Sequence, residues 1–143
     1  MTQTTTVTTQ TIFPGMRYVD ARAAVDWLEK AFGAQKHVVY EGPDGTIAHA
    51  ELWIAGNLIM FGQTRDDAYP VRSPKQVNGV TGGIYVVLPS AEAVDALHTR
   101  AAAAGATIEQ PPYDTDYGSH DFRALDLDGH PWTFGTYNPL AQG

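Results

Sequence analysis

The chain has 143 residues, 43% hydrophobic and 17% charged, a composition typical of one globular domain. Its formal net charge of −7 argues against binding to nucleic acids or anionic membranes, because both need a basic surface. The absence of cysteine excludes disulfides, thiolate catalysis and cysteine-ligated metal centres, and it suits the cytoplasm.

The first residues, 1–11, are rich in Thr and Gln and nearly uncharged. They lack the basic region and the long apolar run of a signal peptide, and no stretch of the chain is long and apolar enough to span a membrane. We therefore expect a flexible N-terminal tail and a cytoplasmic protein.

The first half of the chain predicts a strand, a helix and three more strands. A strand-like run at 12–20 ends in Asp20, which can cap a helix that Gly33 terminates. Inside this helix the apolar residues recur at helical spacing: Ala24, Val25, Leu28 and Phe32. Strands are expected at 34–41, at 46–55 and, after a Gly56-Asn57 turn, at 58–63.

The second half repeats this order after a polar loop at 64–82, which shows no helical or strand period. A strand at 83–90 ends in Ser90, a second helix cap, and Gly105 stops the helix. Strands are expected to begin at 106 and to cover 118–126, followed by an Asp-Gly turn and a closing strand.

Two short motifs support an internal duplication. Ala-Val-Asp-x-Leu occurs in both helices, with Val25 and Val94 69 positions apart (94 − 25). Phe-Gly occurs in both closing strands, with Phe61 and Phe134 73 positions apart (134 − 61). The sequence therefore predicts an α+β fold of two tandem βαβββ units, 12–63 and 83–138, within one compact domain. Their sheets would form a curved mixed trough with helices on the convex side.

The paired units resemble the vicinal oxygen chelate superfamily, the group of glyoxalase I, bleomycin-resistance proteins and extradiol dioxygenases. The segments that carry the resemblance are FPGMRYVDARAAVDWLEKAFGA, HAELWIAGNLIMFG and YGSHDFRALDLDGHPWTFGTY. Enzymes of this superfamily hold a divalent metal in the trough, and the resemblance puts their ligand positions here near Pro14, Met60, Gly83 and Thr133. Because such side chains do not ligate metals well, we expect no cofactor.

Alternation within the strands selects candidate ligand-binding residues. His49, Glu51 and Trp53 share one face of their strand, and Asp121 and Arg123 share a face of another. Alternation shows which residues lie together, but it does not show which of these faces lines the trough. The full predicted set is Tyr18, His49, Glu51, Trp53, Met60, Tyr85, Asp121, Arg123, Thr133 and Tyr137. Trp132 and Phe134 are expected to pack beneath the helices.

The favoured function is non-catalytic binding of an apolar or aromatic small molecule, such as an antibiotic, in a homodimer cleft. We expect no catalytic residue and no metal. The alternative is a divalent-metal-dependent lyase, isomerase or dioxygenase of the glyoxalase type, with a site rearranged around His49 and Glu51. Metal-free acid–base catalysis by His49, Glu51 or Asp121 is a weaker third hypothesis. The remaining histidines are expected mostly at the surface: His37, His98, His120 and His130.

Overall fold

A computed structural model describes residues 9–142 of the chain. Most of the predicted tail, residues 1–8, lies outside the described residues. The first unit contains β1 (Gly15–Tyr18), α1 (Ala21–Phe32), β2 (Gln35–Glu41), β3 (Ile47–Ile54) and β4 (Asn57–Gln63). The second contains β5 (Ile84–Val87), α3 (Ala91–Ala103), β6 (Thr107–Asp114), β7 (His120–Leu125) and β8 (Pro131–Gly135). A short α2 (Pro74–Val77) lies between them, and a 3-10 turn (Pro139–Gln142) follows.

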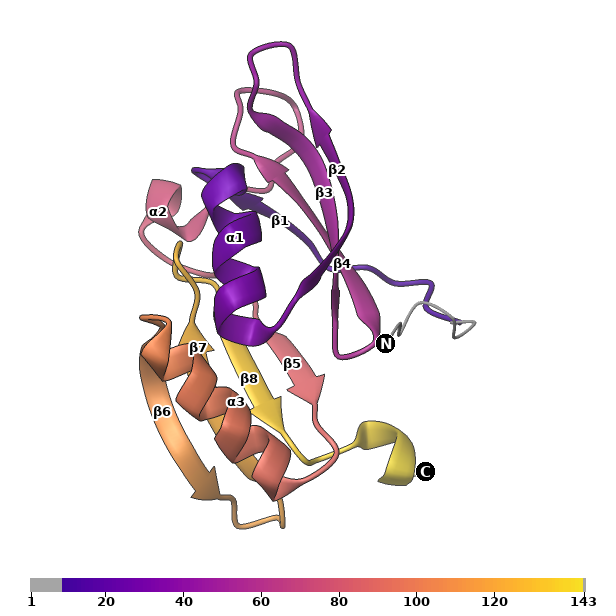
Figure 1. Cartoon of the computed structure of the whole chain (residues 1–143), viewed down its shortest axis with the longest axis vertical. Coiled ribbons are helices and arrows are strands. Elements are labelled where there is room, and N and C mark those ends of the chain that lie inside the picture. Colours follow the sequence, from indigo (N-terminus) through magenta and orange to yellow (C-terminus); the bar gives the residue numbers. More distant parts are fainter. Residues whose placement is uncertain (1–8, 143) are drawn as a thin grey trace.

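Each unit forms its own four-stranded mixed sheet, and neither sheet is closed. Sheet 1 has the order β1-β4-β3-β2, and sheet 2 has the order β5-β8-β7-β6. The first and last strands of each unit run parallel, β1 with β4 and β5 with β8, and the other pairs are antiparallel. The predicted α+β architecture of two βαβββ units is thus confirmed. Within residues 9–142 no strand pairing joins the two sheets, and the units meet through α1 and α3 (Figure 1).

The predicted helix caps are present in both units. The Asp20 carboxylate accepts a hydrogen bond from the Ala23 amide, and Ser90 accepts one from the Ala93 amide. Gly33 and Gly105, which follow the helices, have φ values of 73° and 95°, a region that glycine enters without a Cβ penalty.

The core lies between the helices and one face of each sheet. Its largest fully buried side chains include Tyr18, Leu28, Phe122, Trp132 and Phe134. Phe32 of α1 packs on Phe134 of sheet 2, with ring centroids 4.9 Å apart, so the two units share one core. We call the opposite side of each sheet, which no helix within residues 9–142 covers, its open face.

The repeated Phe-Gly pair has the same role in β4 and β8. Phe61 and Phe134 point into the core, whereas the glycines face the open side. A Cβ at Gly62 would come within 2.5 Å of the Ala48 carbonyl oxygen, and one at Gly135 would overlap the Asp121 carboxylate. Close packing over the open face therefore requires glycine in both copies.

The connections depart from prediction at several points. The turn between β3 and β4 uses Ala55 and Gly56, both at positive φ, and Asn57 already belongs to β4. The predicted loop 64–82 contains α2, whose N-cap Ser73 and Gln76 form a capping box. β6 continues to Asp114, further than its sequence indicates. None of the helices described between residues 9 and 142 is long and apolar enough to cross a membrane.

Candidate functional site on the open sheet faces

The open face of sheet 1 carries four of the predicted residues: His49, Glu51, Trp53 and Met60. Met60 lies opposite Glu51 of β3 and Gly15 of β1, so these positions share a face. His49 and Trp53 flank Glu51 at alternate positions of β3, while the intervening Ala50 and Leu52 are fully buried in the core. The shared face predicted for His49, Glu51 and Trp53 is therefore confirmed, and it is the open one.

His49 and Glu51 bind each other. The Nε2 of His49 lies 2.8 Å from Oε2 of Glu51, and the Nε2 of His37 lies 3.9 Å from its Oε1. The ring of Tyr40 stacks over His49 with 6.2 Å between centroids. A metal ion needs several donors directed at one point, whereas here the imidazole N–H and the carboxylate satisfy one another. Among the described residues no group of three or more potential ligands is arranged to hold a metal ion, and His49 and Glu51 would have to give up their hydrogen bond to ligate one.

Trp53 is the least satisfied polar side chain of this face. Its side chain is largely buried, with 9% of the residue exposed, and its ring meets that of His37 edge to face. The indole Nε1–H is buried and has no acceptor within the described part of the chain. A buried donor without an acceptor costs about 1–3 kcal/mol.

The open face of sheet 2 holds a second group of predicted residues. Thr133 lies between Tyr85 on β5 and Arg123 on β7. Arg123 forms an ion pair with Glu109. Asp121 is 4% exposed and accepts a hydrogen bond from the Ser119 hydroxyl. The shared face predicted for Asp121 and Arg123 is also the open one.

Two tyrosines border this group. The Tyr85 hydroxyl donates to the Tyr137 carbonyl oxygen at 3.0 Å, and burial raises the pKa of the Tyr85 phenol. The Tyr137 ring packs edge to face on Tyr117, with 5.9 Å between centroids. Tyr85 and Tyr137 are both more than a third exposed, which leaves aromatic surface free for contact.

The prediction that Tyr18 faces the trough is wrong. Tyr18 is fully buried among the core side chains, and its hydroxyl donates to Asp126 at 2.7 Å. The strand β1 is turned by one residue relative to the expectation, so Gly15 and Arg17, rather than Pro14 and Tyr18, lie on the open face. Arg17 is paired with Asp67 and stacked on Tyr69, a group that the sequence analysis missed.

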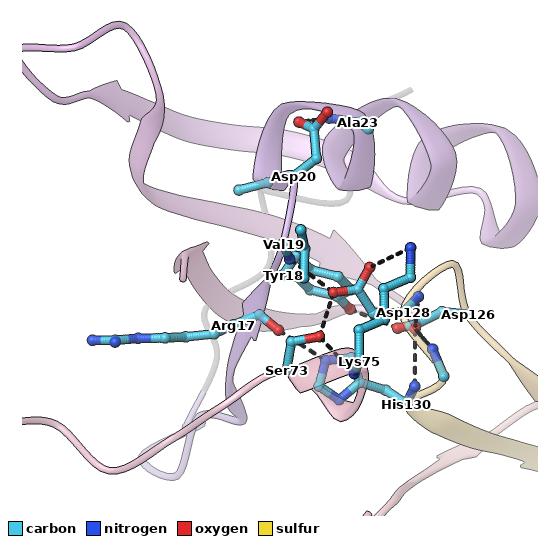
Figure 2. Close-up of polar contacts among 12 residues, drawn as sticks. Arg17, Tyr18, Val19, Asp20, Ala23, Ser73, Lys75, Asp126, Asp128 and His130 are labelled. Atoms are coloured by element: carbon cyan, nitrogen blue, oxygen red, sulfur yellow. Dashed lines mark hydrogen bonds and ion pairs between the residues drawn. The ribbon is translucent and has the colours of Figure 1, made fainter. Parts of the chain in front are cut away.

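The Asp126–Gly129 turn before β8 attaches sheet 2 to the first unit (Figure 2). Asp126 accepts from the Tyr18 hydroxyl, from the Trp132 indole at 3.0 Å and from the amides of Asp128, Gly129 and His130. Asp128 accepts from the Val19 amide at 2.8 Å and from the Ser73 hydroxyl at 2.6 Å. This clasp, formed by Asp126 and Asp128 with their partners, fixes β1 and α2 relative to β8.

The other histidines have structural contacts. The Nε2 of His130 donates to the Arg17 carbonyl oxygen at 3.0 Å, which adds to the clasp. His98 packs edge to face on Phe122. His120 lies between Asp95 and Asp114, with 2.8 Å to each carboxylate. His37 and His120 are the two histidines of this group that form ion pairs within residues 9–142, and His37 is the more exposed, with 42% of its side chain accessible.

Comparison with known proteins identifies relatives of the whole fold. Residues 11–134 match the model of the Glyoxalase/Bleomycin resistance protein/Dioxygenase superfamily. An uncharacterised protein of Mycobacterium bovis is 34% identical over 118 residues, which cover 81% of this chain and 76% of that protein.

Solved structures show the same similarity. TioX from Micromonospora sp. ML1, known from a crystal structure, is 30% identical to this chain in sequence. The two structures superpose with a TM-score of 0.68, and the match covers 88% of this chain and 94% of TioX. A mutant of the fosfomycin resistance protein FosX from Listeria monocytogenes, complexed with Mn(II) and a dihydroxypropylphosphonic acid, is 16% identical. Its TM-score is 0.65 over 93% of this chain and 94% of that one, a likeness of fold alone.

Proposed function

Because the chain belongs to the Glyoxalase/Bleomycin resistance protein/Dioxygenase superfamily, we propose that it binds and sequesters an apolar or aromatic small molecule on its open sheet faces, without a metal. Sequestration of an antibiotic is one form of this function that the family description suggests. The fold itself serves both catalysis and binding, so the proposal rests on the side chains of the faces.

One observation carries the proposal: the open faces present aromatic, thioether and hydroxyl groups where a metal enzyme would need carboxylates and imidazoles. The expected ligand positions, with β1 corrected, hold Gly15, Met60, Gly83 and Thr133. Trp53 lies on the same face as Met60, and Tyr85, which is bonded to Tyr137, lies opposite Thr133. Broad apolar rings with a few hydrogen-bond donors suit a flat aromatic ligand.

The same faces support a homodimer. Each open face belongs to a separate sheet, and in one chain no strand pairing unites them within residues 9–142. A second copy related by a two-fold axis would cover sheet 1 of one chain with sheet 2 of the other and enclose two equivalent clefts. We expect sedimentation equilibrium at micromolar concentration to report a dimer, and a monomer under those conditions would contradict the dimer.

Calorimetric titration after dialysis against EDTA tests the binding function. A panel of planar antibiotics and aromatic metabolites should contain a compound that binds saturably at about one molecule per chain. Adding Mn, Ni, Zn or Fe should leave that affinity unchanged. Failure of the whole panel to bind, or binding that appears only with metal, would overturn the proposal.

The contact of Glu51 with His37 and His49 favours one second candidate, metal-dependent catalysis. Two imidazoles beside one carboxylate are the donor types that catalytic metals use, although their present hydrogen bond opposes joint coordination. Elemental analysis of the dialysed protein discriminates: about one divalent metal per chain would favour this candidate. Its loss in a His49→Ala variant would place the metal at that residue.

A further inference from the structure

The open face of sheet 1 has a small hollow whose lining includes two arginines and two glycines. Its volume is about 180 Å³, and its walls include Arg17, His49, Met60, Arg65 and Tyr69. Such a volume accepts a small polar group together with part of the ring that carries it. The hollow lies next to Met60, within the face proposed above to bind the ligand.

Two glycines keep the hollow open. A Cβ at Gly62 would come within 3.3 Å of the Arg65 guanidinium and 2.5 Å of the Ala48 carbonyl oxygen. A Cβ at Gly15 would lie 3.6 Å from the Tyr69 hydroxyl. Side chains at these two positions would reduce the space between the arginines, so the floor is formed by backbone.

The charge of the hollow is opposite to that of the protein. The chain has a formal net charge of −7 and nine Lys and Arg residues, yet two arginines and no carboxylate are among the described residues that line this space. Arg65 is exposed and donates to the Ala48 carbonyl oxygen at 2.9 Å. Within residues 9–142 it has no ion pair, so most of its five N–H donors stay available for a ligand.

Arg17 already holds a carboxylate supplied by the chain itself. Its side chain is 7% exposed, and its two terminal nitrogens donate to the two oxygens of Asp67 at 2.9 Å each. This hydrogen bond from Arg17 lowers the pKa of the Asp67 carboxyl. Asp67 is 35% exposed and belongs to the segment between β4 and α2, so a carboxylate from solution can compete for the same bidentate geometry.

We propose that this hollow is an anion subsite, in which a carboxylate group of the ligand binds between Arg65 and Arg17 in competition with Asp67. The inference rests on the proposed binding function and specifies its ligand class as an aromatic carboxylate. The ring would extend from the hollow over Met60 toward Trp53. An arginine is well suited to this role because its planar donors match a carboxylate and it stays charged at every physiological pH.

The test compares a charged probe with its neutral isostere. Calorimetric titration with 2-naphthoate and with 2-naphthamide measures the preference of the dialysed full-length protein for the anion. We expect 2-naphthoate to bind about tenfold more tightly or better, the effect of one charge-assisted hydrogen-bond pair. The preference should disappear in Arg65→Gln and persist in Arg72→Gln, a matched exposed arginine that bonds to the carbonyl oxygens of Tyr69 and Val71.

Each contrary result has a distinct meaning. Equal affinity for both probes overturns the anion subsite but leaves a neutral aromatic ligand, and so the proposed function, intact. A preference that survives Arg65→Gln also overturns the subsite. If neither probe binds, the subsite is overturned, and the proposed function is decided separately by the wider panel of compounds.

A second pair of variants examines the competition. In Asp67→Asn the internal carboxylate is removed, and 2-naphthoate should bind several-fold more tightly than to the wild type. Asp66→Asn is the control. Asp66 is exposed, and its substitution removes the same charge without releasing Arg17. Equal gains in the two variants, or no gain in Asp67→Asn, would refute displacement of Asp67.

Discussion

The hydroxyl of Tyr18 donates a 2.7 Å hydrogen bond to Oδ2 of Asp126, two residues that are 108 positions apart in the chain. The same carboxylate oxygen accepts from the Trp132 indole. Through this contact the first strand of sheet 1 and the closing turn of sheet 2 share one buried acceptor. The relation of the two open faces therefore depends on this clasp as well as on the packing of α1 against α3.

Loss of the Asp126 carboxylate should destabilise the protein strongly. In Asp126→Ala the buried Tyr18 hydroxyl and the Trp132 indole both lose their acceptor, and we expect the free energy of unfolding to fall by about 3–5 kcal/mol. Tyr18→Phe should cost about 1–2 kcal/mol. Urea unfolding measures both. Asp116→Ala, at an exposed position, is the control and should stay within about 0.5 kcal/mol of the wild type.

A methyl group at Gly135 should be poorly tolerated. The added Cβ would overlap the Asp121 carboxylate and lie 2.7 Å from the Tyr85 hydroxyl, so Gly135→Ala should destabilise by about 1–3 kcal/mol or more. Gly82→Ala is the matched control, because a Cβ there meets nothing within 4 Å. Thermal unfolding compares the two. Equal melting temperatures would show that Asp121 and Tyr85 move aside freely.

His120 should make stability depend on pH. Hydrogen bonds that the His120 ring donates to Asp95 first, and then to Asp114, raise the pKa of His120 above its ordinary 6.5. Since the folded state binds the proton more tightly, this contribution is complete below pH 6.5 and is lost as the pH rises through the raised folded value.

The comparison of His120→Gln with the wild type measures this contribution. The difference in melting temperature between the two should be largest at acidic pH and shrink toward alkaline pH. Asp95→Asn should reduce the same difference, because it removes the main cause of the shift. A difference that grows with pH would mean that His120 is stabilised as the neutral ring.

Local signals were sufficient to predict most of the fold. Asp20 and Gly33 bracket α1, as Ser90 and Gly105 bracket α3, because capping chemistry depends on neighbouring residues alone. α2 was missed since one turn is too short to show a period, although the capping-box residues Ser73 and Gln76 were a usable signal.

The alternation of side chains along a strand was predictable, but the side of the sheet that each set faces was less so. For β3 this side was left open, and in the four residues of β1 Tyr18 was placed on the wrong face, whereas Tyr85 in the equally short β5 was placed correctly. Met16 and Tyr18 flanking Arg17 were the available hint that apolar residues point inward there. The pairing of Arg17 with Asp67 and of Tyr18 with Asp126 joins distant segments, which no local pattern encodes.

Quenching of Trp53 fluorescence tests the central claim, ligand binding on the open face, most directly. A panel compound that binds should quench the emission of the wild type and of Trp27→Phe saturably, at about one molecule per chain. The quenching should be lost in Trp53→Phe, because Trp27 contacts Phe32 on the helix side whereas Trp53 lies on the open face. Quenching that survives in Trp53→Phe, or no saturable quenching by any compound, would contradict the claim.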